Sequence, residues 1–379
     1  MKTDVTILSD RFATPFDADP MVVCVTSDRS TEIPQHHALL DDEIEDRGDF
    51  AVVLKRFNAR SSGERIICLP PTLHYLRSGD IIRIAPATGQ IWVMYRKESL
   101  NNAIFATERC NSWCVMCSQP PKKVDDSELV NDWLKAIPLM SRETKCLGIT
   151  GGEPTLLGPR LIEIIESCNL HLPQTGLHCL SNGRLFQYLT LAKSVAAVSH
   201  PDLVFGIPLY SDIASRHNYT VQIDGAFDQT LRGILNLARV GIQCEIRVVV
   251  HRHTFDRLPQ LAEFIARNLP FVTHVAWMGY EPIGFGRANL NALWMDPVEY
   301  ADQLAQACTI LRQNAIEQSI YNHQLCVLPQ ELWDLSRQSI SDWKNIYLSA
   351  CEPCQVRQSC GGFFHSAVAN HSRAIAPVL

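Results

Sequence analysis

The stretch "CLGITGGEPTLLGPRLIEIIESC", residues 146–168, contains one strand and one helix joined by a short turn. Residues 146–150 predict a buried strand, and Gly151 and Gly152 follow it as a turn. From residue 158 onward, apolar side chains recur at three- and four-residue spacing, which predicts an amphipathic helix. Because a strand followed by a helix is the unit of parallel α/β sheets, this stretch indicates the fold class.

The same unit recurs through the middle of the chain. Amphipathic runs at 127–137, 158–168, 227–240 and 256–269 alternate with strand-like segments. These segments lie at residues 103–107, 146–150, 176–181, 202–209, 243–250 and 273–278. Six consecutive β/α units predict a parallel sheet with helices outside it, either an open sheet or a barrel-like arc.

A β-rich region precedes these β/α units, and a helical and cysteine-rich region follows them. Residues 1–100 predict a β-rich domain with strands near 21–27, 49–57, 65–70, 80–86 and 90–96. Residues 101–295 hold the β/α units. Residues 296–379 begin with a helical pattern at 297–318 and end in the cysteine-rich segment "ACEPCQVRQSC", residues 350–360. We therefore expect three domains with these boundaries.

Charge and hydropathy limit the partners and the cellular compartment that we expect. The net charge of −6 and pI near 6.1 give no positive field for a phosphate backbone, so we expect no nucleic-acid partner. The first residues, "MKTDVTILSDRF", carry charges where a secretory signal needs an apolar run, and we expect no membrane span. The chain is expected to be cytoplasmic, where its 14 cysteines stay reduced or bind metal.

Three cysteines crowd into the segment "TERCNSWCVMCSQPP", residues 107–121, directly after the first strand of the β/α region. Cys110, Cys114 and Cys117 have the spacing C-x3-C-x2-C, which suits three corners of a cubane iron-sulfur cluster. A zinc site completed elsewhere is the alternative. The turn "GGEP" at 151–154 ends the next strand, so both motifs are expected at the carboxyl edge of one sheet.

"CNSWCVMC" followed by "GGEP" after the next strand resembles the radical S-adenosylmethionine (radical SAM) superfamily. The resemblance implies a partial (β/α)6 TIM-like barrel. It also implies a 4Fe-4S cluster on Cys110, Cys114 and Cys117, whose open iron is chelated by S-adenosylmethionine. One electron from a reductant such as flavodoxin or ferredoxin then cleaves S-adenosylmethionine to a 5'-deoxyadenosyl radical, which abstracts a substrate hydrogen atom.

The same resemblance assigns cofactor-binding residues by position. Gly151, Gly152 and Glu153 would present backbone groups to the methionine amino group. Asn182 and Ser211 stand where the superfamily contacts ribose or methionine. Arg216 or Arg247 would pair with the methionine carboxylate. For these last four residues, a purely structural role is an equal alternative.

The C-terminal cysteines form a second set. Cys351, Cys354 and Cys360 resemble the auxiliary-cluster extensions, of SPASM or twitch type, that follow the barrel in radical SAM peptide-modifying enzymes. The resemblance implies a second 4Fe-4S cluster, with Cys326 as the nearest candidate for its fourth ligand. Other candidates for that ligand are Cys308, His323 and His365. A structural zinc knuckle is the alternative.

Across nearly the whole chain, the motifs "TERCNSWCVMCSQPPK", "ITGGEPTLLG" and "CGGFF" are similar to the radical SAM maturases of bacterial His-Xaa-Ser systems. This resemblance implies modification of a peptide or protein bearing His-Xaa-Ser repeats, and a second radical SAM maturase acting alongside. One alternative is a radical SAM enzyme acting on a small molecule, such as a cyclase of cofactor biosynthesis. Another is a non-catalytic iron-sulfur or zinc protein.

Overall fold

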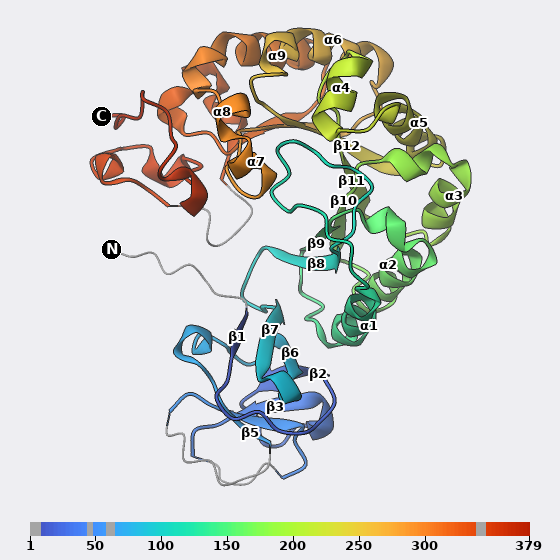
Figure 1. The fold of residues 1–379 in the computed structure, drawn as a ribbon, viewed down its shortest axis with the longest axis vertical. Coiled ribbons are helices and arrows are strands. Elements are labelled where there is room, and N and C mark those ends of the chain that lie inside the picture. The colour runs from blue at the N-terminus through green and yellow to red at the C-terminus, as the bar shows by residue number, and fades with distance from the viewer. Residues whose placement is uncertain (1–8, 44–47, 58–64, 339–345) are drawn as a thin grey trace.

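The computed structural model describes residues 9–43, 48–57, 65–338 and 346–379. These residues form two sheets, one in the N-terminal part of the chain and one in the remainder (Figure 1). The two sheets follow one another along the long axis of the molecule, and the helices form an arc around the second sheet. No helix within the described ranges is long and apolar enough to cross a membrane. The expectation of no secretory signal rests partly on residues 1–8, outside those ranges.

The N-terminal sheet has seven strands in the order β1-β7-β6-β2-β3-β4-β5. Neighbouring strands from β2 to β5 are parallel, whereas β1, β7, β6 and β2 pair antiparallel. All five strands predicted in this region are present, and the short strands β1 and β3 were not predicted. The strands are β1 (Ser9–Arg11), β2 (Met21–Thr26), β3 (His37–Leu40), β4 (Val52–Lys55), β5 (Ile66–Cys68), β6 (Ile81–Ala85) and β7 (Gln90–Tyr95).

The second sheet is entirely parallel and has the order β15-β14-β13-β12-β11-β10-β9-β8. The six strands predicted from the β/α pattern are its members β8 to β13, and two further strands extend it. The strands are β8 (Asn102–Thr107), β9 (Cys146–Gly151), β10 (Gly176–Leu180), β11 (Leu203–Pro208), β12 (Gln243–Val249), β13 (His274–Met278), β14 (Gln318–Tyr321) and β15 (Ser336–Arg337).

The extension corrects the helical prediction for 297–318. The helix there ends at Gln313, Ala315 has a φ of 54°, and the chain then enters β14 beside β13. Gln318 is buried in this strand, where its amide donates to the carbonyl of Cys308 and accepts from the indole of Trp277. A polar residue with satisfied hydrogen bonds inside a strand weakens the apolar pattern, which explains the wrong prediction.

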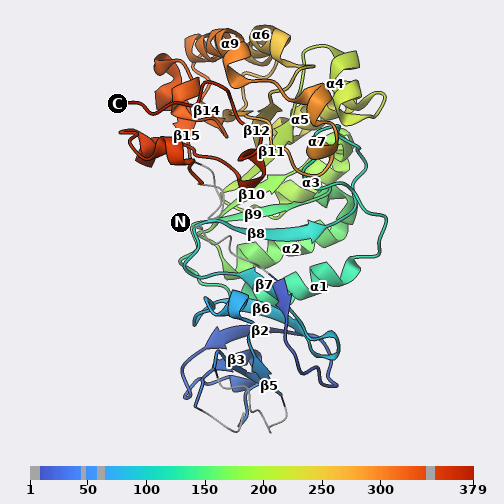
Figure 2. The ribbon, with the colours of Figure 1, turned by 60° about the vertical axis from the view of Figure 1, so that its left-hand side comes forward.

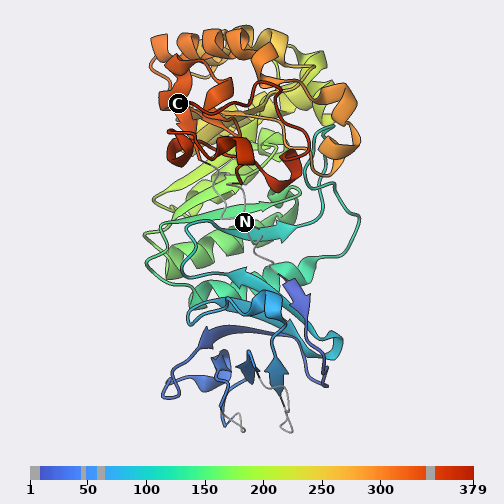
Figure 3. The ribbon, with the colours of Figure 1, turned by 90° about the vertical axis from the view of Figure 1, so that its left-hand side faces the viewer.

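Helices cover the outer face of the parallel sheet and pack through apolar stripes (Figures 1 and 3). In α6, for example, Leu258, Leu261, Ala262 and Ile265 are buried, which is the spacing of one helical face. The helices are α1 (Ser127–Ala136), α2 (Pro159–His171), α3 (Leu189–Ala197), α4 (Ala214–Val221), α5 (Ala226–Arg239), α6 (Leu258–Asn268), α7 (Phe285–Ala288), α8 (Leu290–Leu293) and α9 (Ala301–Gln313).

The N-terminal sheet lies against the β8 and α1 end of the parallel sheet (Figure 2). Arg83 of β6 forms an ion pair with Asp132 of α1, and its guanidinium carbon lies 4.7 Å from the ring centroid of Trp92. Both Ile81 and Tyr95 of the N-terminal sheet are buried in the same apolar cluster as the helices of the parallel sheet. The two sheets therefore share part of one core.

Candidate functional site

The predicted cysteine loop leaves the carboxyl end of β8 and returns to α1. Its base is fixed by Asp126, which is buried. One carboxylate oxygen accepts from the Thr107 hydroxyl at 2.7 Å and the Glu108 amide at 2.6 Å, and the other accepts from Arg109 Nε at 3.0 Å. Burial alone would raise the pKa of Asp126, but these hydrogen bonds and the Arg109 charge lower it below the usual value. The ionised carboxylate of Asp126, at the end of the loop, therefore bonds the residues at its start.

The turn after β9 lies directly against this loop. The amide of Gly152 donates to the Thr107 carbonyl at 2.7 Å, and the amide of Glu153 donates to the Arg109 carbonyl at 2.8 Å. A Cβ on Gly151 would lie 2.4 Å from the Thr107 carbonyl oxygen, and one on Gly152 would lie 2.2 Å from that of Arg109. The two glycines are therefore required by close packing of backbone on backbone.

Glu153 joins this turn to the end of β10. Its side chain is fully buried and accepts hydrogen bonds from the amide and hydroxyl of Thr155, the hydroxyl of Ser181 and the amide of Asn182. Burial raises the pKa of Glu153, while these hydrogen bonds oppose the rise. The carboxyl group therefore links two neighbouring strand ends.

Two side chains after β10 reach back to the cysteine loop. Asn182 Nδ2 donates to Asn111 Oδ1 at 2.6 Å and lies 4.0 Å from Cys110 Sγ. Arg184 Nη1 donates to the Asn111 carbonyl at 2.5 Å and to Ser112 Oγ at 3.1 Å. The sequence analysis assigned no role to Arg184, although its place just after a strand end is typical of site residues.

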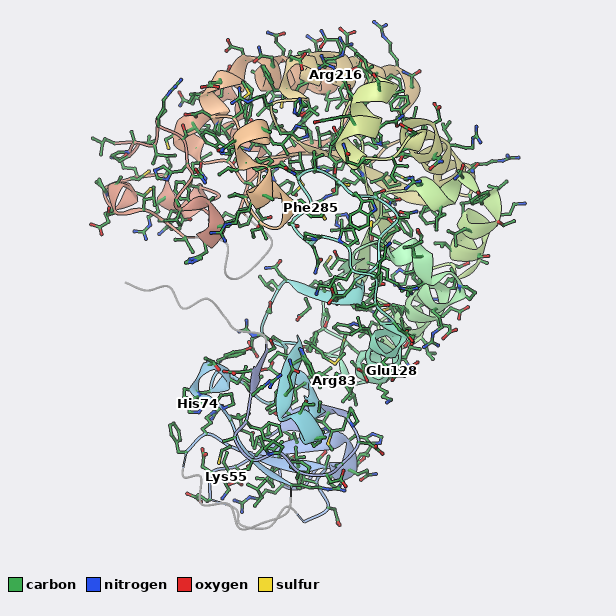
Figure 4. All side chains as sticks on the ribbon, in the orientation of Figure 1. Lys55, His74, Arg83, Glu128, Arg216 and Phe285 are labelled. Carbon is green, nitrogen blue, oxygen red and sulfur yellow. The ribbon has the colours of Figure 1, made fainter. Side chains whose placement is uncertain are left out.

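The opposite side of the loop is held by later segments of the chain. The amides of Trp113 and Val115 donate to the carbonyls of Val221 and Thr220 in α4. The amide of Phe285 in α7 donates to the Cys117 carbonyl at 2.8 Å, and the Phe285 ring stacks on Trp113 with centroids 6.4 Å apart. Phe285 lies inside the arc of helices (Figure 4).

The three thiols are partly buried and electrostatically coupled to one another. Burial raises the pKa of all three, that of Cys110 to about 11, and the neighbouring thiols add to the rise for Cys110 and Cys114. The raised pKa values favour the protonated thiols. A bound cation would reverse this preference for the protonated form, because metal coordination deprotonates a thiol. The clustering fits a cluster bound by three thiolates.

The other residues assigned by position do not bond to the cysteine loop. Ser211 is buried and its hydroxyl accepts from the amide of Ile213. Arg216 Nη1 donates to both carboxylate oxygens of Asp256, at 2.6 and 2.8 Å. Arg216 lies away from Phe285 in Figure 4. Arg247 donates to Glu245 at 2.6 Å and to the Met278 sulfur at 3.2 Å. Both guanidinium groups are thus engaged with other side chains.

A group of buried rings lies beside the thiols. Tyr210, at the end of β11, packs in one cluster with Cys114 and Met116, and its ring lies between those of His217 and His251. Burial lowers the pKa of His217 to about 4 and that of His251 to about 3. Both imidazoles are therefore neutral at pH 7, and His251 Nε2 has no hydrogen-bond partner among the residues that the structure describes.

The four C-terminal cysteines come together. Cys326, Cys351, Cys354 and Cys360 line one cavity of about 10 Å³, and Tyr347 and Arg357 line it as well. The Tyr347 hydroxyl donates to the Cys360 carbonyl at 3.0 Å. Of the ligands considered as fourth member, Cys326 lines the cavity, whereas Cys308 is buried in α9 and His323 bonds to Tyr300. Within the described residues, no group of His, Cys, Asp or Glu is arranged to hold a single metal ion.

The fold and the geometry together define an α/β protein with a candidate iron-sulfur site at the carboxyl ends of β8 to β10. The family model described as "Radical SAM superfamily" matches residues 104–265, from β8 to α6. Residues 104–265 therefore match a radical SAM domain, a family that uses a 4Fe-4S cluster and S-adenosylmethionine. A comparison with curated proteins gives no match.

Solved structures resemble the chain in fold. SuiB of Streptococcus suis bound to S-adenosylmethionine is 14% identical with a TM-score of 0.50, over 62% of this chain and 53% of SuiB. "Native anSMEcpe with bound AdoMet" is 17% identical with a TM-score of 0.46, over 57% of this chain and 62% of that chain. Escherichia coli coproporphyrinogen III oxidase, HemN, is 12% identical with a TM-score of 0.43, over 57% and 52%. The chain therefore spans about half the length of SuiB.

Proposed function

We propose that the protein is a radical SAM enzyme that modifies a side chain or backbone carbon of a peptide or protein. The observation that carries the proposal is the three-cysteine loop, held against the Gly151-Gly152 turn and the end of β10. It lies within the residues that match the family. SuiB, which shares the fold, is bound to S-adenosylmethionine in its solved structure.

Cys110, Cys114 and Cys117 would hold the cluster, and the cluster with S-adenosylmethionine supplies a carbon-centred radical. The protein's own part is to bind, orient and exclude water. Gly151, Gly152 and Glu153 would border the methionine end of the cofactor. The curved parallel sheet with its outer helices would correspond to the partial barrel predicted from the sequence, in domains divided near residues 100 and 295.

Four cysteines around one small cavity support a second, auxiliary 4Fe-4S cluster on Cys326, Cys351, Cys354 and Cys360. It would accept an electron from the product radical or anchor the substrate. The resemblance in sequence supports a substrate with His-Xaa-Ser repeats, a second maturase and a flavodoxin or ferredoxin as reductant, all in the cytoplasm.

Metal analysis of anaerobically reconstituted protein tests both cluster sites. We expect about eight irons in the wild type and about four when Cys110, Cys114 and Cys117 are all replaced by alanine, because each cubane holds four irons. The matched variant at Cys351, Cys354 and Cys360 should also keep about four. Zinc in place of iron would refute the auxiliary cluster.

Catalysis is tested by adding S-adenosylmethionine and dithionite, which should release 5'-deoxyadenosine and methionine. No release would refute the enzyme in favour of a non-catalytic iron-sulfur protein. Co-expression with a His-Xaa-Ser repeat protein should produce a mass shift in that protein, and the Cys110, Cys114 and Cys117 variant should abolish it. Turnover of a nucleotide without any effect on the repeat protein would favour the small-molecule alternative.

A further inference from the structure

A cavity of about 570 Å³, here called the junction cavity, lies where the N-terminal sheet meets β8 and α1. Residues of β7, β8 and α1 make up most of its lining, and Figure 2 shows these elements where the two sheets meet. Four aromatic residues line it: Trp92, Tyr95, Phe105 and Trp133. Its volume falls in the range of ligand sites, and its lining combines apolar surface with a few polar groups, as such sites do.

One wall of this cavity is the free edge of a sheet. β8 is the last strand of the parallel sheet, and among the described ranges no strand pairs with its outer side. The indole of Trp133 donates to the Phe105 carbonyl at 2.9 Å, so a side chain satisfies one backbone acceptor of this strand. Ala103 lies two residues before Phe105 on β8. It is exposed and also lines the cavity. Exposed strand edges of this kind pair readily with a further strand.

The junction cavity leads to the cysteine loop. Glu108, at the carboxyl end of β8, lines it and forms a 2.6 Å ion pair with Lys122. Lys122 in turn lines a second cavity of about 460 Å³, here called the basic cavity, together with Arg109, Cys110 and Lys123. The basic cavity has three cationic side chains in its lining, but Arg109 is paired with Asp126 and Lys122 with Glu108, so Lys123 is the cation without an ion pair among the described residues. The Glu108–Lys122 ion pair joins the linings of the two cavities, and Cys110 lines the second.

We propose that an extended segment of the peptide substrate adds to the free edge of β8. An apolar or aromatic side chain of the segment enters the junction cavity, and an acidic side chain further along pairs with the basic cavity. Main-chain hydrogen bonds supply affinity in such strand addition, and side-chain pockets supply specificity. Lys123 of the basic cavity selects the acidic residue by charge complementarity. This inference rests on the proposed function, because it takes the substrate to be a polypeptide.

The first test measures binding of fluorescein-labelled synthetic peptides by fluorescence anisotropy. The probe TVYVTDD combines a strand-forming apolar half with two acidic residues. Two controls have the same length: TVYVTKK reverses the charge, and TVYVTDD methylated on alternate backbone nitrogens cannot donate its hydrogen bonds. We expect saturable binding of the probe and a loss of roughly tenfold or more for each control, because several hydrogen bonds or charge contacts are lost.

The second test uses variants of the full chain. Ala103→Arg places a long side chain in the junction cavity, and Lys123→Glu reverses one charge of the basic cavity. Each should weaken binding of TVYVTDD by roughly tenfold, and Lys123→Glu should improve binding of TVYVTKK. Gln243→Arg is the matched control, because Gln243 is also exposed at the start of a strand of the same sheet. It should bind as the wild type does.

Hydrogen exchange distinguishes strand addition from side-chain binding alone. The outward-facing amides of residues 102–107, those that do not bond to β9, should exchange more slowly when TVYVTDD is bound, and only slightly more slowly with the methylated peptide. Equal binding by Ala103→Arg, or no added protection of these outward-facing amides, would refute the proposal. So would outward-facing amides that are already protected without peptide, since another chain segment or a second copy would then cover the edge.

These measurements need neither S-adenosylmethionine nor a reductant. A protein that binds TVYVTDD at β8 but releases no 5'-deoxyadenosine would contradict the proposed enzyme and leave the peptide site standing. A protein that releases 5'-deoxyadenosine without binding any of the probes would contradict the peptide site alone.

Discussion

Individual polar side chains hold the cysteine loop in place through hydrogen bonds. Asp126 fixes its base, while Arg184 and Asn182 fix its middle. The sequence pointed to the cysteines because their spacing repeats a known ligand pattern. It did not point to Asp126 or Arg184, because a lone charged residue has no spacing that distinguishes it from a solvated one. Only folding brings such a charged residue to its hydrogen-bond partners.

Replacing Arg184 with leucine should loosen this loop. Arg184 donates to the Asn111 carbonyl, to Ser112 and to Gln229, and a partly buried charged donor contributes about 1–3 kcal/mol through such bonds. We expect a lower melting temperature and faster loss of iron to a chelator. Arg232→Leu, at an exposed position of α5, is the control and should behave as the wild type. Equal iron retention by the two variants would contradict the assigned role.

His251 should make the folded state sensitive to mild acid. Burial lowers its pKa to about 3, so the unfolded chain takes up a proton first, near pH 6.5. The stability that neutral His251 provides is therefore complete above pH 6.5 and is lost as the pH falls toward 3, by up to about 1.4 kcal/mol per pH unit.

The measurement is the urea midpoint as a function of pH for His251→Leu. The slope below pH 6.5 should become smaller but should not vanish, because buried His217, with a pKa lowered to about 4, titrates in the same window. His36→Leu removes an exposed histidine and should leave the slope unchanged. An unchanged slope in His251→Leu would show that this imidazole is not the source.

At the scale of elements, the sequence predicted the six strands that alternate with amphipathic helices. Burial gives the apolar residues of both kinds of element a recognisable spacing. The prediction failed for short or polar strands. β15 has two residues, too few for a period to register, and β14 carries a buried glutamine. The contacts between loops, which build the site, have no sequence period and were not predictable.

The contact between the turn after β9 and the cysteine loop leaves no room for a methyl group at residue 152. Gly152→Ala would put a Cβ 2.2 Å from the Arg109 carbonyl oxygen and 3.2 Å from Cys110 Cβ. It should lower the free energy of unfolding by several kcal/mol and reduce iron binding, because backbone must move. Gly158→Ala meets nothing within 4 Å, but its φ of 55° and ψ of −122° are strained for alanine, so it should cost about 1–3 kcal/mol and keep its iron. Both are compared by thermal unfolding and iron content, and equal losses would refute the steric explanation.

A network across β10, β12 and β13 should be sensitive to stronger acid. Burial alone would raise the pKa of Glu245, but His178, His274 and the Arg247 charge lower it. Because the folded pKa is lowered, the stability that this carboxylate provides is present above its unfolded value of about 4.3 and is lost as the pH falls.

Glu245→Gln should therefore be less stable than the wild type at pH 7, by about 1–3 kcal/mol, and the difference should shrink toward pH 3. Urea unfolding at the two pH values measures this. The exposed Glu263→Gln in α6 is the control and should match the wild type at both. A difference that grows on acidification would contradict the sign.

At the scale of the whole molecule, the two sheets are joined by the part of the core that they share and by polar and aromatic contacts around the junction cavity. Arg83 and Asp132 form an ion pair between β6 and α1, and both side chains are largely shielded from water. The composition of the sequence indicated two kinds of region but not their contact. Neither Arg83 nor Asp132 lies in a motif.

Asp132→Leu leaves Arg83 without its carboxylate and should reduce the free energy of unfolding by about 1–3 kcal/mol. Adding Arg83→Met should recover part of this loss, because two apolar side chains then replace the pair. A double-mutant cycle in urea gives the coupling energy between the two side chains, and a value near zero would show that the pair does not hold the sheets together.

The contact of α7 with the cysteine loop also bears on synthesis in the cell. The Cys117 carbonyl is bonded by the amide of Phe285, and the Val115 carbonyl by the side chain of Asn289, 174 residues further along the chain. A ribosome adds residues in order, so the loop is exposed for the whole time needed to translate that interval. Its final shape can form only after α7 has left the exit tunnel. Assembly of iron on these cysteines is therefore expected late in translation or after release.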